Sequence, residues 1–210
     1  MQNDCFLQTS AVDFYGKERK IMIKELVKKN RSYRTFKREF EISRGELLDF
    51  IDTARLTPSA VNAQPLLYAP LDKEKTDRIL PYTRWAKALD IELPPIGRGP
   101  SAFILVCIDK NKTPSASPAM RDVGIAAQTI LLAAAEKGLG GCMIGSFDNG
   151  GIKRELGFPD NIDVLLCIAL GKPDETVILE DMDKNGSTAY YRDENNRHHV
   201  PKRRLEDIII

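Results

Sequence analysis

The spacing of hydrophobic and polar positions predicts two helices in the first third of the chain. Between residues 17 and 30, apolar side chains recur at helical spacing among lysines. Ser43 and Glu46 then form the Ser-x-x-Glu pattern of a capping box, which satisfies backbone N–H groups at a helix start. The apolar residues of 47–54 fall on one face, and Pro58 closes the pattern. We therefore expect an amphipathic helix directly after Ser43.

A third helix is predicted from residue 122 to about residue 137. Its apolar residues surround nearly the whole circumference, which is typical of a helix buried in the core. We expect Asp122 to cap its first turn and Gly138 to end it, because these residue types favour those positions. A shorter helix is expected at 152–156.

Three apolar runs have the length of strands. The runs at 102–108 and 164–170 are apolar on both faces, which favours central strands of a sheet. A short run at 66–69, between prolines, predicts another strand, and the Gly-rich turn at 140–147 leads into or flanks one more. Strands and helices in this irregular order indicate an α+β fold rather than a doubly wound one.

The length and composition fit one globular domain. The chain has 210 residues, of which 42% are hydrophobic, and this is enough to fill a core. Residues 1–16 have no clear period, so we expect an N-terminal arm followed by a single domain at 17–210. Collagen-like, low-complexity and wholly disordered classes are excluded.

The four cysteines lack the close spacing that zinc, iron–sulfur or dithiol sites need. Cys107 and Cys167 lie within apolar runs, which favours free thiols in a reducing compartment. Neither a run of 18 apolar residues nor the pattern of a signal peptide is present. We therefore expect a cytoplasmic protein with no metal site and no membrane partner.

The basic residues are unevenly distributed, although the formal net charge is only +1. Ten basic and two acidic residues lie between positions 17 and 38. A solvated helix face accounts for the lysines, but Arg31 and Arg34 flank Ser32 and offer forked donors and a hydroxyl, which suit a phosphate monoester. A second basic cluster, at 197–204, either closes on the same anion or forms an exposed tail.

A polar turn follows the second predicted helix. Residues 57–65 concentrate hydroxyl and carboxamide groups between two prolines. Asn62 and Gln64 each offer a donor and an acceptor, so they can bind a ring edge with alternating acceptors and donors, such as the pyrimidine of a flavin. The other interpretation is an ordinary turn.

Familiar phosphate and metal motifs are missing. The glycines of 138–141 close a helix instead of opening one, the G-x-G-x-x-G spacing fails at Met143, and there is no Walker sequence. His198 and His199 are adjacent, so in a strand they would point to opposite faces, which is poor geometry for a shared metal ion. We expect both histidines to be surface residues, and Cys142 to be a small packing residue.

Four ordered segments resemble the FMN-dependent nitroreductase family, and the resemblance spans roughly residues 22–205. The opening signature is the most specific part. The segments are 31–36 together with 54–65, then 122–128, 137–145 and 170–173.

This resemblance implies a three-layer α-β-α sandwich with a central mixed sheet flanked by helices. It also implies an intertwined homodimer with one FMN at each end of the interface. Residues implied to hold the phosphate are Arg31, Ser32 and Arg34, with Lys202 or Arg203 from the tail. Residues implied to approach the flavin from the opposite subunit are Pro58, Ser59, Asn62 and Gln64. The backbone amides near Ile144 and Gly145 are implied to face the flavin N5 edge.

The chain also departs from the family pattern. Asn30 stands where a further arginine is common, and Leu66 replaces a tryptophan that often follows Gln-Pro. The segment from about residue 71 to residue 120 is short for members with a long lid helix, so the substrate pocket cannot be carried over.

The function implied is transfer of a hydride from NAD(P)H through FMN to a quinone, nitroaromatic or similar small electron-poor acceptor. A flavin supplies this chemistry itself, so no catalytic side chain is expected. Two alternatives remain: a flavin protein that stores or senses FMN without turnover, and a basic nucleic-acid-binding module. The second is disfavoured because few aromatic residues accompany the basic run to stack on bases.

Overall fold

The two most apolar strands of the chain lie side by side at the centre of a four-stranded sheet. The computed structural model describes residues 22–86, 91–113 and 115–210, and the expected arm at 1–16 lies outside them. Strand β2 (Ala102–Asp109) pairs antiparallel with β4 (Ile162–Gly171), and both are central, as their continuous apolar runs predict. The edge strands are β1 (Leu66–Leu71), which pairs with β2, and β3 (Gly140–Ile144), which pairs with β4.

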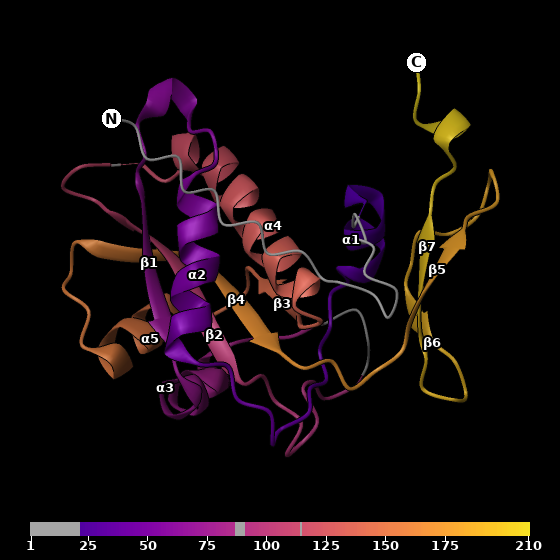
Figure 1. The fold of residues 1–210 in the computed structure, drawn as a ribbon, viewed down its shortest axis with the longest axis horizontal. Coiled ribbons are helices and arrows are strands. Elements are labelled where there is room, and N and C mark those ends of the chain that lie inside the picture. Colours follow the sequence, from indigo (N-terminus) through magenta and orange to yellow (C-terminus); the bar gives the residue numbers. More distant parts are fainter. Residues whose placement is uncertain (1–21, 87–90, 114) are drawn as a thin grey trace, which may run out of the picture.

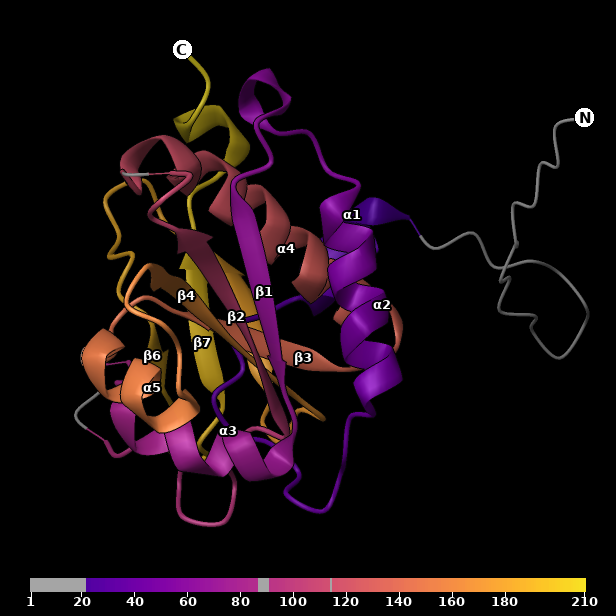
Figure 2. The ribbon, with the colours of Figure 1, turned by 90° about the vertical axis from the view of Figure 1, so that its left-hand side faces the viewer.

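Helices cover both faces of this sheet. Helices α2 (Arg44–Arg55) and α4 (Met120–Glu136) pack on one face, where Ile104 of β2 is fully buried. Helices α3 (Lys73–Ile79) and α5 (Asn149–Leu156) pack on the other face, where Leu105 of β2 is fully buried. Figure 2 shows the two helix pairs on opposite sides of the strands. The expected three-layer α+β sandwich is confirmed.

The start of α2 forms as its sequence predicts. The Ser43 hydroxyl accepts a hydrogen bond from the Glu46 N–H at 3.2 Å, and the Ser43 N–H donates to the Glu46 carboxylate at 2.9 Å. Ile42 and Leu47, on either side of the cap, are both buried. Leu48 is 47% exposed and does not belong to the buried face.

The expectation that Asp122 caps α4 is wrong. A 3-10 turn at Ser117–Ala119 runs directly into the helix, which begins at Met120, so the backbone before Asp122 is already helical. Asp122 instead lies in the first turn and is 5% exposed. The apolar circumference is also only partly covered, because Met120 and Ile125 are exposed. The helix ends as expected, with Gly138 in the left-handed conformation at φ 70°.

The C-terminal part of the chain forms a second, smaller sheet. Strand β7 (His198–Lys202) lies between β5 (Val177–Asp181), which runs parallel to it, and β6 (Tyr191–Arg192), which runs antiparallel. Every pairing in the four-stranded sheet is antiparallel, so mixed pairing occurs in this smaller sheet. Figure 1 shows helix α1 (Ile23–Lys29) between α4 and the smaller sheet. The remaining 3-10 turns are Ala60–Asn62, Leu80–Tyr82 and Leu205–Asp207.

Two glycines of β3 are required by close packing, not by turn geometry. A Cβ on Gly140 would lie 2.4 Å from the ring of Tyr33, and a Cβ on Gly141 would lie 2.2 Å from the backbone oxygen of Ala169. Strand β3 can therefore approach both β4 and the segment after α1. That segment is joined to β3 by a hydrogen bond from the Tyr33 N–H to the Gly141 carbonyl at 3.0 Å.

Alanine at two glycine positions is expected to change stability in opposite directions. Gly141→Ala should lower the free energy of unfolding by about 2 kcal/mol, because backbone must move to accept the methyl group. Gly45→Ala should raise it by about 0.5 kcal/mol, because Gly45 lies in α2 and an added Cβ there meets nothing nearer than the Ser43 hydroxyl at 3.9 Å. Urea unfolding at one protein concentration measures both. Equal effects of the two variants would contradict this packing argument.

Candidate functional site

A cavity of about 470 Å³ lies where α1, α4 and β3 meet the smaller sheet. Its walls are the end of α1 and the segment after it, one side of α4, the start of β3, and alternate residues of β7. The lining residues are Val27, Asn30, Arg31, Ser32, Arg34, Gln128, Leu131, Gly141, Met143, Tyr190, His198, Val200 and Lys202. The predicted phosphate segment and part of the basic tail thus share one cavity.

The two arginines of this segment are held by the backbone around them. Arg31 donates from Nη2 to the Val27 carbonyl at 2.6 Å, while its Nε is buried with no hydrogen-bond partner among the described residues. Arg34 donates from Nη1 to the Ser32 carbonyl at 3.3 Å and lies 5.3 Å from the centre of the Tyr190 ring. Burial lowers the pKa of Arg31 from its ordinary value. Both side chains therefore keep donor capacity for a ligand.

Glu175, which was not predicted from the sequence, holds the arginine segment in place. Its carboxylate accepts hydrogen bonds from the backbone N–H groups of Arg34 and Thr35, the latter at 3.0 Å. Its second oxygen accepts from the guanidinium of Arg192 in β6, and the Glu175 side chain is 3% exposed. The only signal in the sequence was a pair of adjacent acidic residues, Asp174 and Glu175, after a buried strand, with no spacing that links them to the arginines.

Strand β7 presents alternate residues to the cavity, as the two-residue period of a strand requires. His198, Val200 and Lys202 line it. Arg203 does not, and its guanidinium donates instead to the carbonyl of Asp207. Of the two tail residues named for a phosphate, the structure therefore brings only Lys202 to the arginines.

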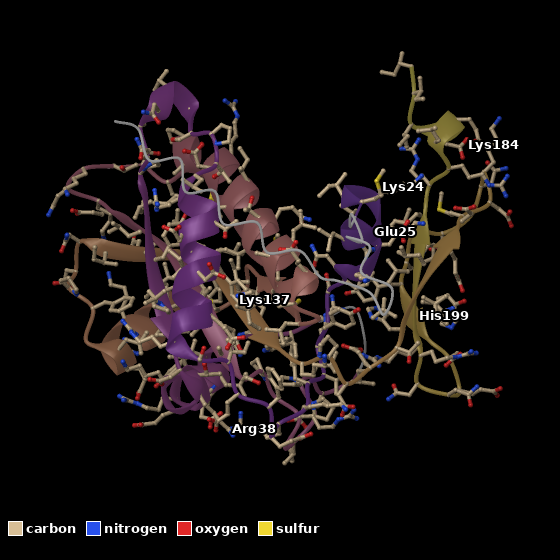
Figure 3. All side chains as sticks on the ribbon, in the orientation of Figure 1. Lys24, Glu25, Arg38, Lys137, Lys184 and His199 are labelled. Atoms are coloured by element: carbon tan, nitrogen blue, oxygen red, sulfur yellow. The ribbon has the colours of Figure 1, made fainter. Side chains whose placement is uncertain are left out.

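The expectation that both histidines are surface residues is wrong. His198 is 2% exposed and His199 is 9% exposed, because β5 and β6 flank β7 on its two edges and neighbouring side chains cover its faces. The strand alternation was predicted and places the two rings on opposite faces. His198 faces the cavity, and Figure 3 shows His199 on the side of the sheet away from α1.

His199 lies between two carboxylates. Its Nδ1 contacts Glu180, its Nε2 lies 3.1 Å from a carboxylate oxygen of Asp193, and its ring stacks on Tyr191 with centroids 4.8 Å apart. Hydrogen bonds to Glu180 and then Asp193 raise the pKa of His199 above its ordinary value. The imidazolium form therefore connects β5, β7 and the turn after β6.

Most of the residues implied to approach the flavin line a different cavity, of about 160 Å³, but Asn62 does not. Pro58, Ser59 and Gln64 line it together with Asp122 of α4. The Ser59 hydroxyl donates to the Asp122 carboxylate at 2.5 Å and accepts from the Gln64 N–H at 2.9 Å. Asp122 thus fixes the turn that the sequence had assigned to ring recognition.

The tip of this turn adopts backbone conformations that are unusual for its residues. Val61, Asn62 and Gln64 have φ values of 49°, 56° and 47°, in the left-handed region. The Val61 side chain is 99% exposed, and the Asn62 side-chain oxygen accepts from the Gln64 amide at 3.1 Å. This shape carries Asn62 and Gln64 outward, away from the sandwich core.

Ile144 and Gly145 lie at the end of β3. The Ile144 side chain is buried in the core at 4% exposure, whereas Gly145 is exposed, and a Cβ added to it would have no neighbour within 4 Å. Met143 is the neighbouring residue whose side chain reaches the cavity wall. Cys142 is buried, and burial raises the pKa of its thiol, which agrees with the expected packing role.

Two further findings concern the described part of the chain only. No group of three or more potential ligands among its histidines, cysteines and carboxylates could hold a metal ion. No helix within residues 22–86, 91–113 and 115–210 is long and apolar enough to cross a membrane.

Comparison with solved structures defines the class of fold. A nitroreductase family protein from Clostridium novyi NT is 25% identical, with a TM-score of 0.60 over 73% of this chain and 86% of that one. A protein assigned provisionally as a nitroreductase from Desulfovibrio desulfuricans, solved in complex with FMN, is 20% identical, with a TM-score of 0.65 over 91% of this chain and 97% of that one. The architecture is thus that of the nitroreductase fold.

The sequence comparisons give the family. The model of the nitroreductase family matches residues 27–172, so the chain belongs to that family. A Methanothermobacter thermautotrophicus protein named provisionally as an NADH dehydrogenase/NAD(P)H nitroreductase is 29% identical over 80% of this chain and 85% of its own length. An NADPH-flavin oxidoreductase of Vibrio harveyi is 36% identical, over 35% of this chain and 36% of its own.

The stabilising effect of His199 is expected to depend on pH. Because its pKa is raised on folding, the stabilisation is fully present below the ordinary histidine pKa of about 6.5 and is lost as pH rises through the higher folded pKa. The stability difference between wild type and His199→Gln should therefore be larger at pH 6 than at pH 9, as measured by urea unfolding.

His198→Gln is the matched control for this prediction. In the protein without ligand, burial and the Arg34 charge lower the pKa of His198 to about 4, whereas a histidine in the unfolded chain binds a proton with a pKa of about 6.5. The stability of wild type relative to His198→Gln should therefore rise from pH 6 to pH 9, opposite in direction to the His199 effect. A His199→Gln difference that is constant or grows with pH would show that the ion cluster does not contribute as described.

Proposed function

We propose that the protein is an FMN-dependent oxidoreductase that passes a hydride from NAD(P)H to a small electron-poor acceptor. The observation that carries this proposal is the concentration of Arg31, Arg34 and Lys202 in one cavity. No carboxylate lines that cavity among the described residues, so its charge favours an anion. Arginine forks and a hydroxyl group suit a phosphate monoester.

The size of the cavity and the unpaired polar atoms in its walls also suit such a ligand. Its volume of about 470 Å³ is in the range of small-molecule sites, and its walls combine apolar side chains with a few polar groups. Arg31 Nε and both ring nitrogens of His198 are buried and have no hydrogen-bond partner in the described chain. Buried donors rarely stay unpaired in a working protein, so a polar ligand at this place accounts for them.

The active unit in this proposal is a homodimer. In one chain, the phosphate segment and the Pro58–Gln64 turn line separate cavities. Gln128 of α4 lines the first cavity and Asp122 of α4 lines the second, and these two residues are separated by about 9 Å along the helix axis. A second copy can supply its outward-facing turn to the cavity of the first. The exposed apolar side chains of Met120, Ile125 and Val61 are available for such a contact.

The work of the protein in this proposal is to bind and orient. When bound, FMN supplies the hydride chemistry. Arg31, Arg34 and Lys202 anchor the phosphate. We expect the backbone amides near Ile144 and Gly145, next to the cavity-lining Met143 at the end of β3, to donate to the edge of the ring system. Hydrogen bonds to a charged acceptor are the stronger ones, so such donors favour an anionic reduced ring. Quinones and nitroaromatic compounds are suitable acceptors because their flat rings can stack on the planar flavin ring.

The proposal is tested by visible spectroscopy of the purified protein after FMN loading and desalting. We expect a retained flavin spectrum, and rapid bleaching after anaerobic mixing with NADH or NADPH. Retained flavin that neither nicotinamide bleaches would support the alternative of an FMN store or sensor. Protein that stays colourless after loading would refute both.

Loss of one anchoring arginine should weaken binding of FMN more than binding of riboflavin, which lacks the phosphate. Charge-assisted hydrogen bonds contribute about 1.5–3 kcal/mol, so Arg34→Ala should raise the FMN Kd by roughly 10- to 150-fold. Fluorescence titration measures both Kd values.

Lys37→Ala is the control for this prediction. Lys37 is an exposed cation close in sequence to Arg34 but outside the cavity lining, so its loss should leave both Kd values within about twofold. An Arg34→Ala variant that loses FMN and riboflavin affinity equally would mean that Arg34 does not bind the phosphate.

A further inference from the structure

His198 is the polar residue of the cavity wall that the anchoring role of the arginines leaves unexplained. Its ring is 2% exposed and lines the cavity, yet neither Nδ1 nor Nε2 has a hydrogen-bond partner in the described part of the chain. A buried imidazole without partners is costly, because each unpaired polar atom has lost its hydration. The cavity is where a partner for it can enter.

The sheet holds this ring in a fixed place. Tyr190 packs edge-on against His198 with ring centroids 5.3 Å apart, and the Arg34 guanidinium lies over the same Tyr190 ring, 5.3 Å from its centre. Lys202, four residues further along β7, lines the cavity on the same strand face. The His198 ring is therefore grouped with two of the cations that are proposed to bind the phosphate.

The charges around His198 are mostly positive. Arg34 from the segment after α1, Arg192 from β6 and His199 from β7 disfavour a proton on the ring, whereas Glu175 favours one. Burial is the largest influence, and together these effects lower the pKa of His198 to about 4. At neutral pH and without a ligand, the ring is therefore neutral, with one N–H donor and one free acceptor nitrogen.

We propose that His198 is a ligand of the FMN phosphate and that it takes up a proton from solvent when the phosphate binds. This inference rests on the proposed function. A phosphate monoester adds about two negative charges to a cavity whose described lining contains cations and no carboxylate. Those charges reverse the local potential that excludes the proton, and the resulting imidazolium has two donors in place of one.

This role differs from that of the arginines. Arg31, Arg34 and Lys202 are positive whether or not the ligand is present, whereas His198 gains its charge together with the anion. Because binding and protonation are linked, His198 makes the retention of FMN stronger as pH falls. The neighbouring His199 cannot replace it, because Glu180 and Asp193 already occupy both of its nitrogens on the opposite face of β7.

The experiment uses the fact that the chain contains only two histidines. NMR of the imidazole ring signals between pH 5.5 and pH 9, with His198→Gln and His199→Gln for assignment, follows each ring separately. Without ligand, we expect the His199 signal to titrate in this range and the His198 signal to stay in its neutral position. With saturating FMN, the His198 signal should titrate in the range, with a midpoint at or above about 6.5.

Two further ligands identify the group that causes this change. Inorganic phosphate at high concentration should reproduce it, and riboflavin should not. An equal change with riboflavin would assign it to the flavin ring or its sugar chain and would overturn the phosphate role. A His198 signal that stays neutral with FMN bound would overturn proton uptake.

Calorimetry provides a second readout that is independent of turnover. The number of protons taken up on FMN binding follows from titrations in buffers of different ionisation enthalpy. At pH 6.5, wild type should take up about half a proton or more in excess of His198→Gln, since the phosphate itself titrates equally in both proteins. Equal uptake by the two proteins would contradict the proposal.

Two measurements separate the role of His198 from FMN binding itself. If wild type binds no FMN by fluorescence titration, the function and the inference both fall. If wild type binds FMN and His198→Gln shows the same pH dependence of Kd, only the role of His198 is refuted.

Discussion

The buried carboxylate of Glu175 is the interaction on which the candidate site depends. One of its oxygens accepts the backbone N–H groups of Arg34 and Thr35, and the other accepts the Arg192 guanidinium. The cavity has one wall on the segment after α1 and another on β7, and these parts are more than 160 residues apart in the sequence. Glu175 joins them because it contacts one directly and reaches the other through β6, which pairs with β7. Without this link, nothing in the local sequence brings the arginines and Lys202 together.

Two elements, β7 and α4, each carry residues with separate structural and cavity-lining roles. On β7, His198 faces the cavity while His199 lies between two carboxylates, so a single strand supplies both a cavity-facing ring and a structural ion cluster. On α4, Asp122 fixes the Pro58–Gln64 turn, and Gln128, further along the helix, lines the cavity that contains Arg31 and Arg34. The helix therefore separates the two halves of the proposed flavin site within one chain, and this is why we propose that a second copy completes the site.

The sequence predicted correctly those features that depend on interactions between residues close together in the chain. The apolar runs of β2 and β4, the capping box at Ser43 and the left-handed end of α4 at Gly138 follow from short-range rules. The grouping of Arg31 and Arg34 with the basic tail was one of two alternatives that the residues left open, and the resemblance to a family singled out Lys202 or Arg203. The burial of His198 was not predictable, because it arises from strand pairings and side-chain packing across the C-terminal segment. Asp122 was misassigned because a 3-10 turn extends the helix before it.

A crystal structure of the FMN-loaded protein tests the proposed flavin site most directly. We predict that the phosphate lies in the cavity within hydrogen-bond distance of Arg31, Arg34, Lys202 and His198. We also expect the turn around Gln64 of a second copy to contact the ring system. A phosphate bound outside this cavity, or FMN enclosed by a single chain, would contradict the proposed site.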